Sequence, residues 1–189
     1  MPSCPAPAAD VSRPTVDTAA LAAVNENPAE FEAIYRAYIQ PVFRYLYNRM
    51  GDRQEAEELT SQTFLAVMER LPAYKHNGHF PAWLFSIARH KAADYFRRQS
   101  RHPETELAED LPQPATENQA GFAATELREL SALIISLPND DQELLRLRYV
   151  AELSFAEIAA LQGRKMDAVK KTLYRLQARL QKQMEAGDE

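Results

Sequence analysis

Apolar residues recur at intervals of three and four along much of this chain, which is the spacing of amphipathic helices. After Pro28 the pattern predicts a helix that ends before Gly51 and Asp52. A second helix is predicted from about Arg53 to Leu71, where Pro72 ends it. The first of these helices turns a set of apolar side chains inward, namely Phe31, Ile34, Tyr35, Tyr38, Val42, Phe43 and Leu46. The second turns inward Ala56, Leu59, Thr63, Phe64 and Val67.

A third helix is predicted over 80–101, where Pro81 occupies a first-turn position that tolerates proline. Its apolar side carries Trp83, Leu84, Ile87, Ala88 and Lys91 and continues toward Tyr95, and its other side carries Arg89, His90, Arg97, Arg98 and Arg101. A polar loop over 74–79 precedes it. The helix therefore presents an apolar stripe to a core and a basic stripe to a partner.

The helical period stops after residue 101 and returns near residue 124. Segments 124–136, 140–150, a short helix after Ser154 and a last helix from 166 to about 184 follow. Asn139 with Gln142, and Ser154 with Glu157, have the spacing of capping boxes. The side chains expected inward in the first and last of these segments are Leu127, Leu130, Leu133, Ile134, Val169, Leu173, Leu176 and Leu180.

These elements predict an all-α protein with two small helical domains joined by a flexible acidic linker. The predicted division is a disordered tail over 1–26, a first domain over 27–101, a linker over 102–122 and a second domain over 123–185. The acidity of the linker fits two readings: charge that keeps a linker extended and soluble, or a specific role.

Composition narrows the class of protein. The chain has 189 residues, of which 46% are hydrophobic, and no apolar run approaches the ~20 residues that span a bilayer. Cys4 is the only cysteine, so an internal disulfide and a cysteine-based zinc site are excluded. The N-terminus lacks the pattern of a signal peptide. We expect a cytoplasmic protein without membrane insertion, in which Cys4 is either inert or a redox or metal handle.

Charge is strongly segregated along the chain, although the net charge is −5. Acids dominate 52–58 and 103–129, whereas 89–101 and 164–182 are basic. Such segregation is a better guide to partners than the sum of charges. It predicts two basic faces suited to phosphates and two acidic ones.

The second basic segment follows a short helix and a tight turn at 162–165, which is the plan of a helix-turn-helix. In that plan the N-terminal residues of the second helix enter the major groove of DNA. The candidates for this entry are Lys165, Asp167, Ala168, Lys170 and Lys171, with Arg175 on phosphate. The alternative is an amphipathic helical hairpin with solvated lysines.

Tyr74, Phe80 and Trp83 surround the polar loop beside the first basic helix. This arrangement suits the capture of an unpaired base, and the alternative is that the aromatic rings anchor the loop in the core. His76, His79 and His90 lack partners at ligand spacing, so we expect no metal or cofactor. No catalytic motif occurs, and we expect no enzyme.

Two stretches resemble a known family. Residues 55–65 (EAEELTSQTFL), 80–94 (FPAWLFSIARHKAAD) and Arg97-Arg98 resemble region 2 of the bacterial sigma-70 family. Leu137-Pro138, residues 147–149 (LRY), 153–159 (LSFAEIA) and 169–171 (VKK) resemble region 4. With only these two regions, the chain resembles an extracytoplasmic-function (ECF, group 4) sigma factor, which implies transcription initiation by assembly with core RNA polymerase.

The resemblance implies roles for individual residues. Region 2 would dock on the clamp helices of the polymerase β′ subunit through Asp52, Glu55, Glu58, Leu59, Gln62 and Leu65. The minus-10 promoter element would be recognised and melted by Lys75, Asn77, His79, Phe80, Trp83, Arg89, His90, Arg97 and Arg98. Region 4 would read the minus-35 element and contact the β flap, and the acidic linker would run toward the active-site cleft.

The family also implies an anti-sigma partner that masks the polymerase-binding surfaces. Two other classes fit the pattern less well. A stand-alone helix-turn-helix regulator would bind duplex DNA without polymerase, and a helical adaptor that binds no DNA would leave the two basic helices unexplained.

Overall fold

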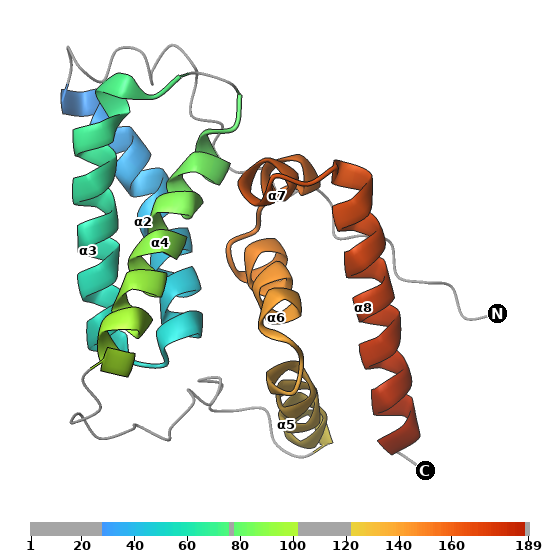
Figure 1. Cartoon of the computed structure of the whole chain (residues 1–189). Coiled ribbons are helices and arrows are strands. Elements are labelled where there is room, and N and C mark those ends of the chain that lie inside the picture. Colours follow the sequence, from blue (N-terminus) through green and yellow to red (C-terminus); the bar gives the residue numbers. More distant parts are fainter. Residues whose placement is uncertain (1–27, 76–77, 102–121, 188–189) are drawn as a thin grey trace.

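A computed structural model describes residues 28–75, 78–101 and 122–187, which form two helical bundles (Figure 1). The N-terminal bundle consists of α2 (Pro28–Met50), α3 (Arg53–Arg70), the 3₁₀ turn η1 (Leu71–Ala73) and α4 (Phe80–Arg101). The C-terminal bundle consists of α5 (Phe122–Ile135), α6 (Asn139–Leu145), the π-helical turn η2 (Arg146–Val150), α7 (Phe155–Gln162) and α8 (Met166–Gly187). The described ranges contain no strand, which confirms the all-α prediction. The predicted tail, Cys4 and the acidic stretch 102–121 lie outside these ranges.

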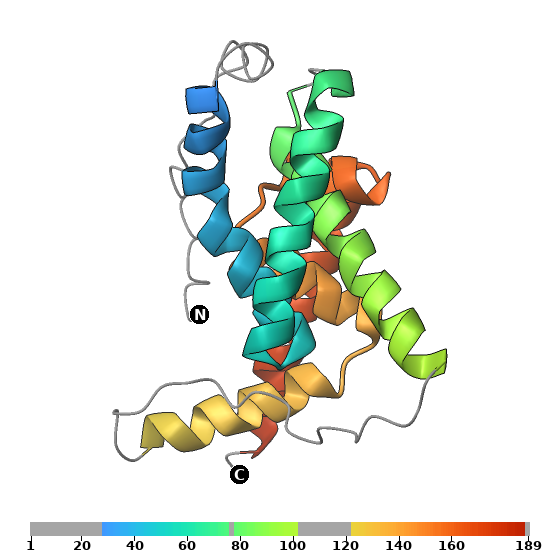
Figure 2. The same cartoon turned by 90° about the vertical axis from the view of Figure 1, so that its left-hand side faces the viewer.

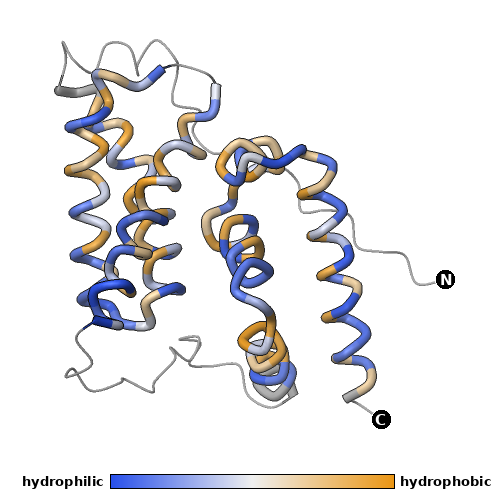
Figure 3. Tube along the Cα trace, viewed as in Figure 1, coloured by the Kyte–Doolittle hydropathy of each residue, from blue (hydrophilic) through white to orange (hydrophobic). Residues whose placement is uncertain are grey.

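The core of the N-terminal bundle is aromatic and aliphatic. Tyr45, Leu84 and Phe85 are fully buried, and the rings of Tyr45 and Phe85 meet edge to face with centroids 5.5 Å apart. All the positions predicted to face inward on α3 are buried. Asp52 caps this helix, because its side chain accepts a hydrogen bond of 2.8 Å from the Glu55 amide. Figure 3 shows hydrophobic and hydrophilic positions alternating along the helices, as in amphipathic helices.

Helix α8 contributes four buried side chains to the core of the C-terminal bundle. Val169, Leu173, Leu176 and Leu180 are buried, as their spacing predicts. Leu127 is 47% exposed, so its predicted inward position is wrong. The reason is that α5 packs mainly against α8, so a narrower stripe of its surface is covered than its sequence pattern suggests.

The predicted capping box at Asn139 is also wrong. Helix α6 begins at Asn139 itself, and the Gln142 side chain instead donates hydrogen bonds to the Ile135 and Leu137 carbonyls at 3.0 and 2.9 Å. The predicted helix over 140–150 is thus α6 followed by η2, in which the Ala151 amide donates to the Arg146 carbonyl at 2.8 Å. That wider turn ends the helix before α7.

The predicted capping box at Ser154 is confirmed. The Ser154 amide donates to the Glu157 carboxylate at 2.7 Å, and the Glu157 amide donates to the Ser154 hydroxyl at 3.2 Å. Gly163 ends α7 with φ of 63° and ψ of 32°, the left-handed conformation that glycine adopts without steric cost. These two local signals set the length of α7 and the turn into α8.

Replacing Gly163 with valine should destabilise the C-terminal bundle by about 1–2 kcal/mol, since a β-branched residue is strained at positive φ. Beyond the adjacent residues of the chain, no atom lies within 4 Å of the added Cβ, so the cost comes from the backbone conformation. Urea unfolding measures the change. Ala160→Val, at an exposed position of α7, is the control for β-branching in a helix. Equal losses in the two variants would contradict this account.

The two bundles pack against each other, which the division of the sequence into two domains does not predict. Helix α4 contacts α7, and α2 contacts η2. In Figure 1 the C-terminal bundle lies along one side of the N-terminal bundle, with α3 on the side away from α8, and in Figure 2, turned by 90°, α3 lies in front of the C-terminal bundle. The packing leaves the outer face of α3 uncovered.

Candidate functional site

The end of α4 is a positively charged surface. Arg97, Arg98 and Arg101 are all exposed in the last turns of the helix. Arg97 pairs with Asp94, and this hydrogen bond is the main reason that the pKa of the Asp94 carboxyl is lowered. The remaining positive charge can follow a phosphate backbone.

The start of α4 is an aromatic cluster. The Trp83 ring lies 4.7 Å from the Tyr74 ring and 5.6 Å from the Phe80 ring, centroid to centroid. Phe80 is only 4% exposed and also contacts Tyr38, so it supports the cluster from within the core and is not part of the surface. Trp83 and Tyr74 are both half-buried. Of the three aromatic candidates, Trp83 and Tyr74 are the ones that a base can reach.

The other residues predicted for the minus-10 element are spread from the loop before α4 to the last turns of this helix, where Arg97 and Arg98 lie. Lys75 is exposed and His79 is half-buried, whereas Asn77 lies outside the described residues. His90 is exposed, and its Nδ1 lies 2.6 Å from the Ser86 carbonyl. The Arg89 side chain is 40% exposed, and its Nε lies 3.7 Å from a carboxylate oxygen of Glu143 in α6. Arg89 therefore faces the other bundle.

The first turns of α8 present the residues predicted to enter the major groove. Lys165, Asp167, Ala168, Lys171 and Arg175 are exposed. Lys170 is half-buried, and its ammonium lies 5.6 Å from the centre of the Phe155 ring. Arg148 approaches the same ring at 4.7 Å. Phe155, at the start of α7, thus holds one predicted reader by a cation–π contact.

Arg164 belongs to this surface, although the sequence analysis did not name it. It is exposed, and it donates hydrogen bonds of 3.0 Å to the Thr172 hydroxyl and 3.3 Å to the Gln162 side chain. Its position in the basic turn before α8, next to Lys165, was a usable signal in the sequence. The bond to Thr172 places the guanidinium along the exposed side of α8.

The outer face of α3 combines acidic and apolar side chains. Asp52 and Glu58 are exposed, and Glu58 accepts a hydrogen bond of 2.9 Å from Gln62. Leu65 and Met68 are 57% and 51% exposed. Leu59 is 4% exposed and belongs to the core, so it offers no surface to a partner.

Met68 was not among the residues predicted for this face. Its position three residues after Leu65, outside the buried stripe of α3, was a usable signal. The same face carries a cluster of carboxylates at its start. Burial, and then the charges of Glu58 and Asp52, raise the pKa of the Glu55 carboxyl. Close carboxylates beside exposed apolar side chains suit a partner with basic and apolar groups.

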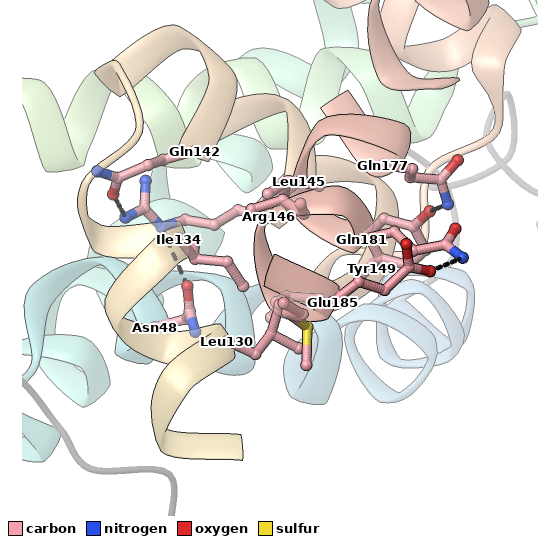
Figure 4. A pocket seen from close by; sticks show the side chains of 13 residues that line it. Asn48, Leu130, Ile134, Gln142, Leu145, Arg146, Tyr149, Gln177, Gln181 and Glu185 are labelled. Carbon is pink, nitrogen blue, oxygen red and sulfur yellow. Dashed lines mark hydrogen bonds between the residues drawn. The ribbon is translucent and has the colours of Figure 1, made fainter. Parts of the chain in front are cut away.

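A cavity of about 660 Å³ lies between α5, η2 and α8 (Figure 4). Leu130, Ile134, Leu180 and Met184 supply much of its apolar lining. Its rim is polar, since Gln177 donates a hydrogen bond of 2.5 Å to the Tyr149 hydroxyl. The size and apolar lining suit a side chain or short helix of a partner.

In the described part of the chain, no helix combines the length and the apolar character that crossing a bilayer needs.

Comparison with known proteins agrees with this geometry. Family models match in two places: sigma-70 region 2 over residues 34–102, and sigma-70 region 4 over residues 127–180. The first match covers the N-terminal bundle with its basic helix α4, and the second covers the helix-turn-helix.

Curated relatives extend the similarity over most of the chain. It is 34% identical over 77% of its length to the ECF RNA polymerase sigma factor BldN of Streptomyces coelicolor, of which it spans 56%. It is 30% identical over 79% of its length to the ECF RNA polymerase sigma factor SigM of Bacillus subtilis, of which it spans 91%.

Solved structures share the fold. CnrH in complex with the cytosolic domain of CnrY matches with a TM-score of 0.65 and 21% identity, over 90% of this chain and 98% of that one. The sigma factor RpoE in complex with the anti-sigma factor NepR, from Bartonella quintana, matches with a TM-score of 0.61 and 19% identity, over 85% and 99%. The two matched regions and the relatives together show that the chain belongs to the ECF sigma factors of the sigma-70 family.

Proposed function

We propose that this protein binds core RNA polymerase and directs it to promoters, with the N-terminal bundle at the minus-10 element and the C-terminal bundle at the minus-35 element. One observation carries the proposal. A single chain holds two separate basic surfaces, at the end of α4 and at the start of α8, and the helices that bear them match regions 2 and 4 in order. The protein has no reaction to catalyse in this role and acts in the cytoplasm, where polymerase and chromosome meet.

The division of labour follows from the chemistry of each surface. The acidic and apolar face of α3 suits the polymerase, because Leu65 and Met68 remain exposed and neighbouring carboxylates repel DNA. The arginines of α4 and the first turns of α8 suit phosphates and base edges. The apolar cavity beside α8 suits a helix from a protein partner, which is the place for the β flap or an anti-sigma factor.

Run-off transcription tests the proposal directly. Core RNA polymerase is incubated with and without this protein on a pool of genomic promoter fragments, and the transcripts are mapped. Discrete new start sites that depend on the protein support the proposal, and their aligned upstream sequences define the promoter. Duplex DNA binding by the protein alone, without new transcripts, would favour the stand-alone regulator and overturn the proposal.

Trp83→Ala should slow promoter opening by about tenfold and change closed-complex formation less, because stacking on an unpaired base contributes about 1–3 kcal/mol. The half-buried ring of Trp83 is available only to a base that has left the duplex stack. Permanganate reactivity of thymines measures opening, and gel retention of the polymerase–promoter complex measures binding. A promoter with a premelted minus-10 element is the control, since it should restore transcription. Equal loss of opening and binding would contradict this role.

A further inference from the structure

Two cations share one aromatic ring where three elements of the C-terminal bundle meet. Phe155 is the first residue of α7. The centre of its ring lies 4.7 Å from the guanidinium carbon of Arg148 in η2 and 5.6 Å from the ammonium of Lys170 in α8. Both distances fall within the ~6 Å over which a cation is attracted to the face of a ring. The ring therefore gathers positive groups from two other elements at the start of α7.

Further contacts hold both the ring and the cations in place. The Arg148 guanidinium donates a hydrogen bond of 2.9 Å to the Leu153 carbonyl, just before α7. Tyr174, one turn beyond Lys170 on α8, meets the Phe155 ring edge to face with centroids 6.1 Å apart. Because Arg148, Phe155 and Lys170 are all half-buried, their side chains lose less conformational freedom on binding a partner than fully solvated ones.

Neither cation is neutralised by a carboxylate of the described residues. Arg49 and Arg146, which are half-buried like Arg148, both pair with Glu143. In contrast, no ion pair within the described ranges joins Arg148 or Lys170 to an aspartate or glutamate. Two positive charges held at one ring repel each other, so a negative group close to both is attracted by each. The pair suits a phosphate.

The position of the ring indicates which part of DNA supplies this phosphate. Helices α7 and α8 form the helix-turn-helix, a plan in which the first helix crosses the DNA backbone and the second enters the major groove. Phe155 is at the start of the first helix, so the cations at its ring lie beside the backbone. Lys171, the residue after Lys170, is exposed and remains a candidate for the groove.

We propose that Phe155 is a positioning residue that holds Arg148 and Lys170 against the DNA backbone at the minus-35 element. This role rests on the proposed function. Lys170 then contributes affinity that does not depend on sequence, instead of reading a base edge. Arg148, which was not among the predicted DNA-binding residues, joins the DNA-binding surface. Sequence choice is left to exposed residues of α8 such as Lys171.

The ring contact is tested in the free protein, without polymerase or DNA. An aromatic ring shifts the NMR signals of protons over its face upfield, so the side-chain methylene signals of Lys170 should lie upfield of those of Lys171. Lys170→Arg assigns the signals. Phe155→Leu should move them to the positions of a solvated lysine, and Phe155→Tyr should retain the shift. Signals of a solvated lysine at Lys170 in the unchanged protein would overturn the proposal.

Promoter binding by core polymerase with the full chain tests the role of the ring. Two DNA fragments are compared, namely a promoter found by the run-off assay and the same promoter with a scrambled minus-35 element. Phe155→Leu should weaken binding of both by about three- to tenfold, because the cations lose their fixed positions. Phe155→Tyr keeps the ring and should restore binding. A loss confined to the intact promoter would indicate base reading and overturn the proposal.

The salt dependence of the same binding reports on the cations. Arg148→Gln and Lys170→Gln should each lower the salt slope by about 0.9, the value for one phosphate contact. Phe155→Leu combined with Lys170→Gln should weaken binding by less than the product of the two single effects, since residues in contact are coupled. Phe155→Leu combined with Lys171→Gln should give the full product. Unchanged salt slopes, or a full product in both pairs, would overturn the proposal.

A further variant separates the loss of positioning from a loss of packing. Leu161 is half-buried at the other end of α7, and Leu161→Ala removes apolar contacts from the same helix. With its helices retained by circular dichroism, this variant should bind the promoter as the unchanged protein does. Equal weakening by Phe155→Leu and Leu161→Ala would assign the effect to packing and overturn the proposal.

The outcomes also separate this role from the proposed function. The salt slopes of Arg148→Gln and Lys170→Gln test the role even where Phe155→Leu does not fold. New transcripts together with unchanged salt slopes would overturn the role of the ring and leave the proposed function in place. Absence of any transcript with the unchanged protein would instead contradict the proposed function, and the NMR test of the ring contact would remain valid.

Discussion

Leu65→Asp will lower the affinity of this protein for core RNA polymerase by at least about tenfold and abolish transcription at limiting protein. The Leu65 side chain is 57% exposed on the outer face of α3, beside Met68, which is 51% exposed. Burying this side chain against a partner is worth about 1.5–3 kcal/mol, and a buried aspartate adds an unpaired charge to that loss. Fluorescence anisotropy of labelled protein titrated with core polymerase measures the effect.

The matched control places the same charge elsewhere on the same bundle. Ala33→Asp adds a carboxylate at an exposed position of α2, away from the face of α3. It should bind polymerase with unchanged affinity. Thermal melts should show that both variants remain folded, because Leu65 contributes little to the core. Wild-type affinity in the Leu65→Asp variant would show that α3 is not the polymerase-binding face.

The double variant Lys171→Ala, Arg175→Ala will reduce transcription from a promoter with a minus-35 element by about 10- to 100-fold and leave polymerase binding intact. The two side chains are exposed and lie four residues apart, on one side of α8 near its N-terminus. A base contact contributes about 1–3 kcal/mol, and each phosphate contact adds about 0.9 to the salt slope of binding. The binding of promoter DNA by the polymerase with this double variant should therefore also depend less steeply on salt concentration.

Lys182→Ala is the control for this prediction. Lys182 is exposed on the same helix but lies about 16 Å beyond Lys171 along the axis, at about 1.5 Å per residue. The Lys182→Ala variant should leave transcription and the salt slope of promoter binding unchanged. Weakened polymerase binding by the double variant would contradict the division of labour between the faces of the protein. An unchanged salt slope would show that Lys171 and Arg175 do not contact phosphate.

Much of the local structure followed from residue spacing. The inward stripes of α3 and α8 and the capping box at Ser154 were predicted correctly, because each depends on residues within a few turns of one another. Local sequence signals gave a wrong prediction where a side chain had a second possible hydrogen-bond partner. Gln142 could cap the next helix or close the preceding turn, and the free carbonyls of Ile135 and Leu137 decided in favour of the turn.

The sequence predicted which kinds of surface the protein has. It predicted less well which residues belong to each surface. The basic faces of α4 and α8 are visible in the sequence because charged residues at helical spacing share a side. Whether one member is buried depends on neighbouring helices, so Phe80 and Leu59 proved to be core residues and Met68 and Arg164 were overlooked. The individual roles of these residues remain predictions for the experiments above.

The amino-acid sequence alone determined the helices, their order, their apolar stripes and the resemblance to regions 2 and 4, since these properties are encoded over short separations. Only the tertiary structure decided that the two bundles are packed together around Glu143. Glu143 lies 98 residues from Tyr45 and 94 from Arg49 along the chain, so no periodicity connects them. An acid in an amphipathic helix is ordinarily solvated, and this one becomes an interdomain contact because folding brings three arginines and a buried tyrosine to the same point.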